Sequence, residues 1–130
     1  LFTMLASFLS IILFSIATPV IQAGSIFARG FSGDGTYYDV GPGSCGSYNS
    51  NNEYVAALNK EQMGYASNPN ENPNCGRRVR VSGPNGRTLT ITIVDMCPAC
   101  GYGSLDLSPV VYRQLGGGSA GRIHINWSWA

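Results

Sequence analysis

The sequence predicts a small, mainly β domain that closes as a barrel and carries two short helices. Short segments with alternating apolar and polar residues recur along the chain, as expected for strands. Glycine and proline, at 17 and 7 of the 130 residues, separate these segments and leave little room for long helices. Several short strands with only two helical stretches favour a small β-barrel.

The first 23 residues are typical of a secretory signal peptide. Met4 to Ala17 is almost wholly apolar, Pro19 breaks the run, and cleavage is expected after Ala23. The run is shorter than the roughly 20 residues that span a membrane, so a membrane anchor is the less favoured alternative. The chain starts at Leu1 with no initiator Met and no basic segment before the apolar run, so we expect that it is truncated or that its true start is Met4.

The remainder is expected to be one secreted domain. After the signal at 1–23, residues 24–29 form a short leader and 30–130 form the domain, with 107 residues beyond the signal for a small core. This part holds all 8 Lys and Arg and all 7 Asp and Glu, and its net charge of +1 is not that of a nucleic-acid-binding protein. We expect a monomer with no nucleic-acid or membrane partner. Four arginines still cluster, and we interpret them as a solvated face: Arg77, Arg78, Arg80 and Arg87.

The first half of the domain contains one aromatic strand, one helix and one irregular loop. The strand lies among glycine turns in 30–46. Residues 51–63 predict a helix, because an asparagine can cap it and its apolar residues recur at helical spacing. The Asn- and Pro-rich segment 66–76 predicts a loop that Cys75 ties down.

The second half begins with a hairpin. Residues 77–82 and 87–95 alternate on either side of the turn sequence GPNG. By the two-residue period of a strand, Asp95 points to the apolar side of the second strand. Either the strand ends there or an acid is placed at the rim of the core. The apolar face of this strand consists of Leu89, Ile91 and Ile93.

A short helix and a final strand complete the domain. Ser108 caps the helix, Pro109 occupies its first position and Gly116 ends it. The last strand, in 121–130, alternates strictly, and the only histidine, His124, lies on its polar face. Its apolar face consists of Ile123, Ile125, Trp127 and Trp129.

Four cysteines in a short secreted chain predict two disulfides. Zinc would need a second CxxC knuckle, and a redox CxxC would need a βαβ context, and the sequence shows neither. We therefore expect no metal and no cofactor. Of the three pairings, Cys45–Cys75 with Cys97–Cys100 is favoured because the CxxC spacing is short and local. Closing the 30-residue span would contribute about 3–4 kcal/mol in the chain-entropy model.

The carboxylates that could carry chemistry are Asp34, Asp39, Asp95 and Asp106. Asp95 and Asp106 stand at the two ends of the CxxC loop. Asp106 lies between two leucines, where burial would raise its pKa and suit it to proton donation. An equal alternative is a structural acid that hydrogen-bonds amides at the start of the following helix.

The aromatic residues suggest a sugar-binding groove. Tyr37 and Tyr102 stand in glycine-rich, loop-like segments near the acids, where their rings could stack on pyranose rings. Trp127 and Trp129 are instead expected in the core, because they lie on the apolar face of a strand.

Several motifs together resemble a known family. The segments GDGTYYDVGPGSCG, NPNCG, ITIVDMCPACGYGSLDLSP and GRIHINWSWA resemble the double-psi β-barrel domain of expansin-like proteins, over about residues 30–130. The likeness is greatest to small secreted fungal loosenins, within the rare-lipoprotein-A-like (RlpA-like), barwin and expansin group. The resemblance implies a six-stranded barrel with an open groove for cell-wall polysaccharide: cellulose, β-glucan or chitin. It places Thr36, Tyr38, Asp95 and Asp106 in the groove, and Cys97 where expansins have a tyrosine.

The resemblance implies loosening of wall polymers without net hydrolysis. Barrel-fold endoglucanases of the wider group use an acid and a base, which here would be Asp106 and Asp39. The TYYD segment is one residue shorter than their motif and their dense cysteine pattern is missing, so we do not expect a true hydrolase. Lytic enzymes of the group use an acidic, histidine-containing segment that 51–63 does not reproduce. A third possibility is a protein-binding effector or protease inhibitor of the kiwellin or barwin type, with a secreted protein as its partner.

Overall fold

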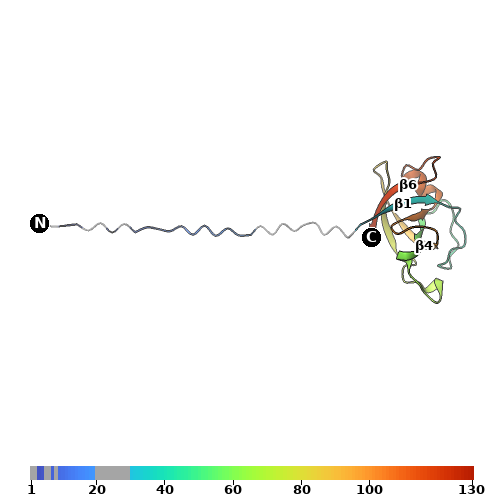
Figure 1. Ribbon diagram of the computed structural model, residues 1–130, viewed down its shortest axis with the longest axis horizontal. Helices are drawn as coiled ribbons and strands as arrows, with labels where there is room; N and C mark the ends of the chain where they lie inside the picture. Colours follow the sequence, from blue (N-terminus) through green and yellow to red (C-terminus); the bar gives the residue numbers. More distant parts are fainter. Residues whose placement is uncertain (1–2, 5–6, 8, 20–29) are drawn as a thin grey trace.

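The computed structural model describes residues 3–4, 7, 9–19 and 30–130 (Figure 1). The described residues before residue 20 have no helix or strand and are exposed. The predicted cleavage site after Ala23 and the leader 24–29 lie outside the described residues. Within the described ranges, no helix has both the length and the apolar character needed to cross a membrane.

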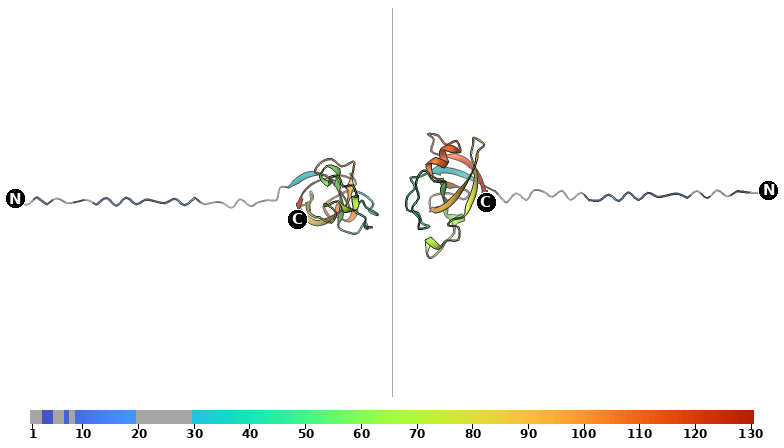
Figure 2. Two further views of the ribbon diagram at one scale, coloured as in Figure 1. Left: turned by 90° about the horizontal axis from the view of Figure 1, so that it is seen from below. Right: turned by 180° about the vertical axis from the view of Figure 1, so that it is seen from behind.

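Six strands close into a barrel in the order β1-β5-β2-β4-β3-β6, and Figure 1 labels three of them, β1, β4 and β6. The predicted fold class, mainly β with two short helices, is confirmed. The views in Figure 2 show β1 beside β6, its antiparallel neighbour, while its other neighbour β5 runs parallel to it. The elements are β1 (Phe31–Tyr37), β2 (Val55–Asn59), α1 (Lys60–Met63), the 3-10 turn η1 (Pro69–Glu71), β3 (Arg78–Ser82), β4 (Thr88–Cys97), β5 (Leu105–Leu107), α2 (Pro109–Gln114) and β6 (Ile123–Trp129).

The core fills the barrel with the inward side chains of the alternating strands. The predicted hairpin is β3 and β4, and the predicted last strand is β6, with Ile125 and Trp127 buried and His124 exposed. The predicted second helix is α2, which begins with Pro109 and packs on the barrel through Val111. The largest fully buried side chains are Leu58, Val79, Val81, Ile91, Ile93, Leu105, Leu107, Val111, Leu115 and Ile125.

The helix predicted over 51–63 is wrong. The middle of this segment is strand β2, which pairs with β4 on one side and with β5 on the other. All five of its residues are buried, and a strand covered on both faces shows no alternation by which to recognise it. Helix remains only in α1, where the side chain of Asn59 accepts a hydrogen bond from the backbone N–H of Gln62 at 3.0 Å.

The orientation predicted for Asp95 is also wrong, because β4 contains an irregularity. Ala56 pairs with Ile93, but Ala57 pairs with Asp95, so Val94 is an extra residue on β4. Such a β-bulge reverses the alternation beyond it. Ile93 and Val94 are consequently both buried, and Asp95 faces outward while the strand continues to Cys97.

Candidate functional site

Strand pairing brings the predicted groove residues into one row on the outer face of the barrel. Thr36 on β1 pairs with Asp106 on β5, Asp106 pairs with Ala57 on β2, and Ala57 pairs with Asp95 on β4. Partners in register on neighbouring strands point to the same face. The two acids are therefore separated by one strand, β2, and the small Ala57 lies between them.

Asp106 is the central acid of this row. It is half-buried between the inward-facing Leu105 and Leu107. The hydroxyl of Thr36 donates a hydrogen bond to its Oδ1 at 2.8 Å. Burial raises the pKa of Asp106 above its ordinary value; the Thr36 hydrogen bond opposes this rise and the Asp95 charge adds to it. The side chain thus combines a fixed orientation with a carboxyl group that binds a proton more readily than a solvated one.

Asp95 is held by backbone groups. Its Oδ1 accepts hydrogen bonds from the backbone N–H of Ser44 and of Met96, each at 2.8 Å. The loop that contains Ser44 lies close against β4, since a Cβ on Gly43 would come within 2.5 Å of the Val94 carbonyl oxygen. The neighbouring Cys45 joins Cys75 in a disulfide and thereby fixes this loop.

Tyr38 completes the site from the end of β1. Burial raises the pKa of its phenol, and the charges of Asp95 and Asp106 raise it further, so the phenol stays protonated. Among the described residues, three buried polar side-chain atoms lack a hydrogen-bond partner. Two of them are the hydroxyls of Tyr38 and Ser44, which both belong to this site. The site therefore contains two buried hydroxyls that no other protein group satisfies.

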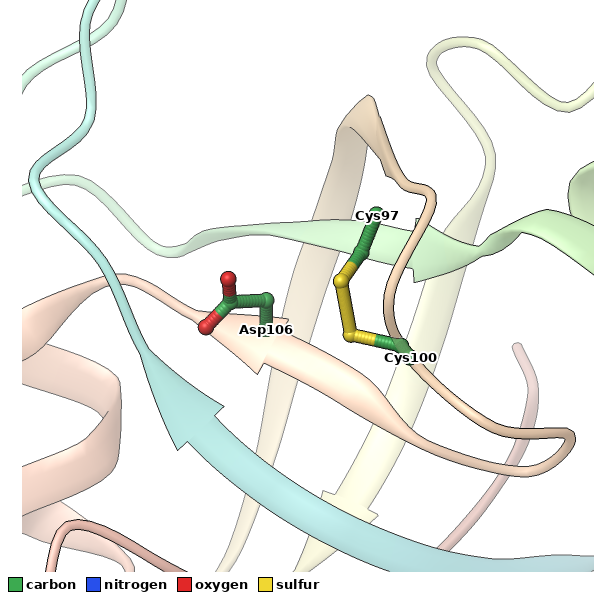
Figure 3. A group of neighbouring side chains, drawn as sticks. All are labelled: Cys97, Cys100 and Asp106. Carbon is green, nitrogen blue, oxygen red and sulfur yellow. A yellow bond between two sulfur atoms is a disulfide. The ribbon is translucent and has the colours of Figure 1, made fainter.

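The Cys97–Cys100 disulfide lies beside the side chain of Asp106 (Figure 3). The two sulfurs and a carboxylate oxygen of Asp106 lie within 4.8 Å of one another. Because the sulfurs are bonded to each other, neither is a thiolate that could ligate a metal. The disulfide and Asp106 line a pocket of about 230 Å³ together with Thr36, Asp34 and other residues.

An ion pair also lines this pocket. Nη1 of Arg122 lies 2.7 Å from Oδ2 of Asp34, and both side chains are about half exposed or more. The backbone N–H of Asp34 donates a hydrogen bond to the hydroxyl of Ser104 at 3.0 Å, which holds β1 at this position. The pocket that Thr36 lines therefore also contains one acidic and one basic side chain, those of Asp34 and Arg122.

The other predicted site residues lie around this row and not in it. Tyr37 is half exposed and packs against Tyr112 of α2, with 4.7 Å between ring centroids. Tyr102 is exposed beyond the disulfide and makes an edge contact with Phe31 at 6.1 Å. Asp39 is exposed and accepts a hydrogen bond from the side chain of Asn51 at 3.2 Å. Their roles in binding or catalysis stay predictions.

The sequence did not reveal the contribution of Ser44 or of Ala57. Ser44 stands directly before Cys45, and its place beside a cysteine was the one feature of the sequence that could have indicated a fixed position near the site. Ala57 lay in the segment assigned to a helix, so its place between the acids became visible only with the strand pairing.

A comparison with protein families finds one match that spans the domain. The family model described as lytic transglycolase matches residues 25–127. The chain is 38% identical over 85 residues to the "Allergen Asp f 7 homolog" of Arthroderma benhamiae, covering 65% of this chain and 28% of that protein. It is 31% identical over 129 residues to kiwellin of Actinidia chinensis, covering 88% and 55%. The chain thus spans about a quarter to a half of the length of these relatives.

Solved structures share the barrel. The Streptomyces papain inhibitor aligns with a TM-score of 0.70 and 32% identity, covering 78% of this chain and 94% of that one. A mutant expansin of Clavibacter michiganensis, in complex with cellohexaose, aligns with a TM-score of 0.65 and 27% identity, covering 78% and 50%. One similar barrel was therefore solved with a glucan oligosaccharide, and another is a protein that inhibits a protease.

Proposed function

Because the chain belongs to the RlpA-like double-psi β-barrel family, whose lytic transglycolase model matches residues 25–127, we propose that it binds cell-wall polysaccharide in the groove and loosens it without net hydrolysis. The polymer is cellulose, β-glucan or chitin. We propose that it acts outside the cell or in the wall, since its two disulfides are of the kind that persist in oxidising compartments.

The observation that carries this proposal is the row of polar groups at Asp106 and Asp95. Two carboxylates with fixed orientations can accept hydrogen bonds from a ligand. A neutral polymer rich in hydroxyl groups can supply the donors. The similar expansin that was solved with cellohexaose supports the same ligand class.

The geometry supports binding more than cleavage. An inverting glycosidase leaves room for a water molecule between its acid and its base. Here Ala57 of β2 separates Asp106 from Asp95 in the strand pairing, and Asp95 already accepts two backbone hydrogen bonds on one oxygen. The alternative base, Asp39, is exposed and bound to Asn51.

The test is Asp106→Asn, with Glu71→Gln as a control that removes one negative charge from an exposed position on η1. Affinity for insoluble cellulose, β-1,3-glucan and chitin is measured by depletion, and release of reducing ends is measured in parallel. We expect Asp106→Asn to bind roughly tenfold or more weakly, the cost of one hydrogen bond to a charged group, and Glu71→Gln to bind normally. Unchanged binding and loosening in Asp106→Asn would refute the proposal. New reducing ends that disappear in Asp39→Asn would establish the glycosidase alternative with Asp106 as acid.

A protein partner is the second function that a specific observation favours. Tyr65 is 93% exposed and borders a pocket of about 220 Å³ lined also by Met63 and Met96. Exposed tyrosine is enriched at protein interfaces, and the similar barrel of the Streptomyces inhibitor acts on a protein. A papain inhibition assay of the wild type and Tyr65→Ala tests this function. Inhibition that Tyr65→Ala abolishes would support it, and no inhibition by the wild type would exclude papain as its target.

A further inference from the structure

The barrel has a second polar face around β3. In the strand order, β3 is three strands away from β5 in either direction, so β3 lies on the opposite side of the barrel from Asp106. Arg78 and Arg80 point outward from β3 and are exposed, while Val79 and Val81 point into the core. We call the outward side chains of β3, of β6 and of the first half of β4 the β3 face.

The β3 face is positively charged and contains no acid. Residues 78–82, 88–94 and 123–129 include no Asp or Glu, and all seven acids of the chain lie among the described residues. Arg78, Arg80 and the adjacent Arg87 are exposed and form no ion pair with any described residue. Their charge is therefore available to an anion from outside, although the chain as a whole carries only +1.

An open hollow lies beside Arg80. It has a volume of about 330 Å³ and a mainly apolar surface, and the polar residues at it are Arg80, Ser82, Thr88, Asn126 and Ser128. Thr90 and Ser128 flank Arg80 in the pairing with β4 and β6. The hydroxyls of Ser82 and Thr88 bond each other at 2.7 Å, and the Asn126 side-chain oxygen accepts from Ser32, so the guanidinium of Arg80 is the group offered to a carboxylate.

We propose that the β3 face binds an acidic, carboxylate-bearing polysaccharide, while the groove on the other side binds a neutral one. This rests on the proposed function, because it takes the second ligand from the same wall. The face favours a polysaccharide over a single-stranded nucleic acid, since none of the exposed aromatic side chains of residues 30–130, Tyr37, Tyr48, Tyr54, Tyr65 and Tyr102, lies on its strands for base stacking. One barrel then contacts two polymers at once and joins them.

The test compares Arg78→Gln/Arg80→Gln with the charge-matched control Lys60→Gln/Arg113→Gln, whose residues are exposed on α1 and α2. Affinity electrophoresis of the full chain in polygalacturonate gels gives the dissociation constant at low and at high salt. We expect the β3 variant to bind about fivefold more weakly than the control variant at low salt, the effect of losing two exposed ion pairs. The difference should vanish at 1 M salt, where charges are screened within a few ångströms.

Two further arms separate this proposal from the groove. Asp106→Asn should bind polygalacturonate as the wild type does, and the β3 variant should bind cellulose as the wild type does. Equal affinity of the β3 and control variants for polygalacturonate, or no affinity of the wild type at low salt, would overturn the β3 proposal even if the groove binds normally. Tighter binding to a single-stranded oligonucleotide or to anionic vesicles than to polygalacturonate would also overturn it.

Discussion

The two disulfides should contribute very differently to stability. Cys45–Cys75 closes a span of 30 residues, whereas Cys97–Cys100 closes a span of 3. In the chain-entropy model the long bridge lowers the free energy of the folded state relative to the unfolded state by about 3.6 kcal/mol, and the short one by about 1.6 kcal/mol. The predicted difference, about 2 kcal/mol, is large compared with the net stability of a domain of this size.

The assay is thermal unfolding of Cys45→Ser/Cys75→Ser and Cys97→Ser/Cys100→Ser beside the wild type. At about 4–8 °C per kcal/mol, the melting temperature should fall by roughly 15–30 °C without the long bridge and by about 6–13 °C without the short one. Removal of the long bridge should also weaken polysaccharide binding, because it frees the loop whose Ser44 amide holds the site. A short-bridge variant as unstable as the long-bridge variant would refute this reasoning, since loop length would then not govern the effect.

Two other predictions concern the groove. Thr36→Val removes the hydrogen bond that lowers the pKa of Asp106, so that carboxyl should titrate at higher pH in an NMR titration. If the ionised carboxylate is the sugar ligand, binding is present above this pKa and is lost as pH falls through it. The loss should then begin at higher pH in Thr36→Val, while Thr36→Ser should behave as wild type; an unchanged or lowered pKa would contradict the assignment. Gly43→Ala would place a Cβ 2.5 Å from a backbone oxygen of β4, and should cost about 1–3 kcal/mol in chemical denaturation and weaken polysaccharide binding. Gly41→Ala is its control, because nothing lies within 4 Å of that Cβ, and equal stability of the two variants would show that the loop adapts.

Local patterns predicted the elements that have one buried face. β3, β4 and β6 alternate in the sequence because one side of each meets the core and the other meets solvent, and the structure has these strands where the pattern places them. The short helix α2 was likewise marked by its own proline and glycine. In these segments the physical cause is local, so the sequence displays it.

The errors occurred where neighbours in space decide the structure. β2 is buried on both faces, so its apolar run lacks the two-residue alternation of a strand, and the spacing of Tyr54, Val55 and Leu58 predicts a helix instead. The bulge at Val94 reverses the direction of Asp95, and it exists only relative to the partner strand. Neither feature can be read from the periodicity of its own segment.

The sequence by itself determined the fold class, the four cysteines and the identity of the acids at the ends of the CxxC loop. Only the tertiary structure decided that Thr36 contacts Asp106, 70 residues away, and that Asp95 stands across β2 on the same face. It also placed the arginines of β3 on the side of the barrel opposite the acids. The reason is physical: side-chain alternation is a property of one strand, whereas a site built across four strands depends on their order and register, which form through pairing between distant segments.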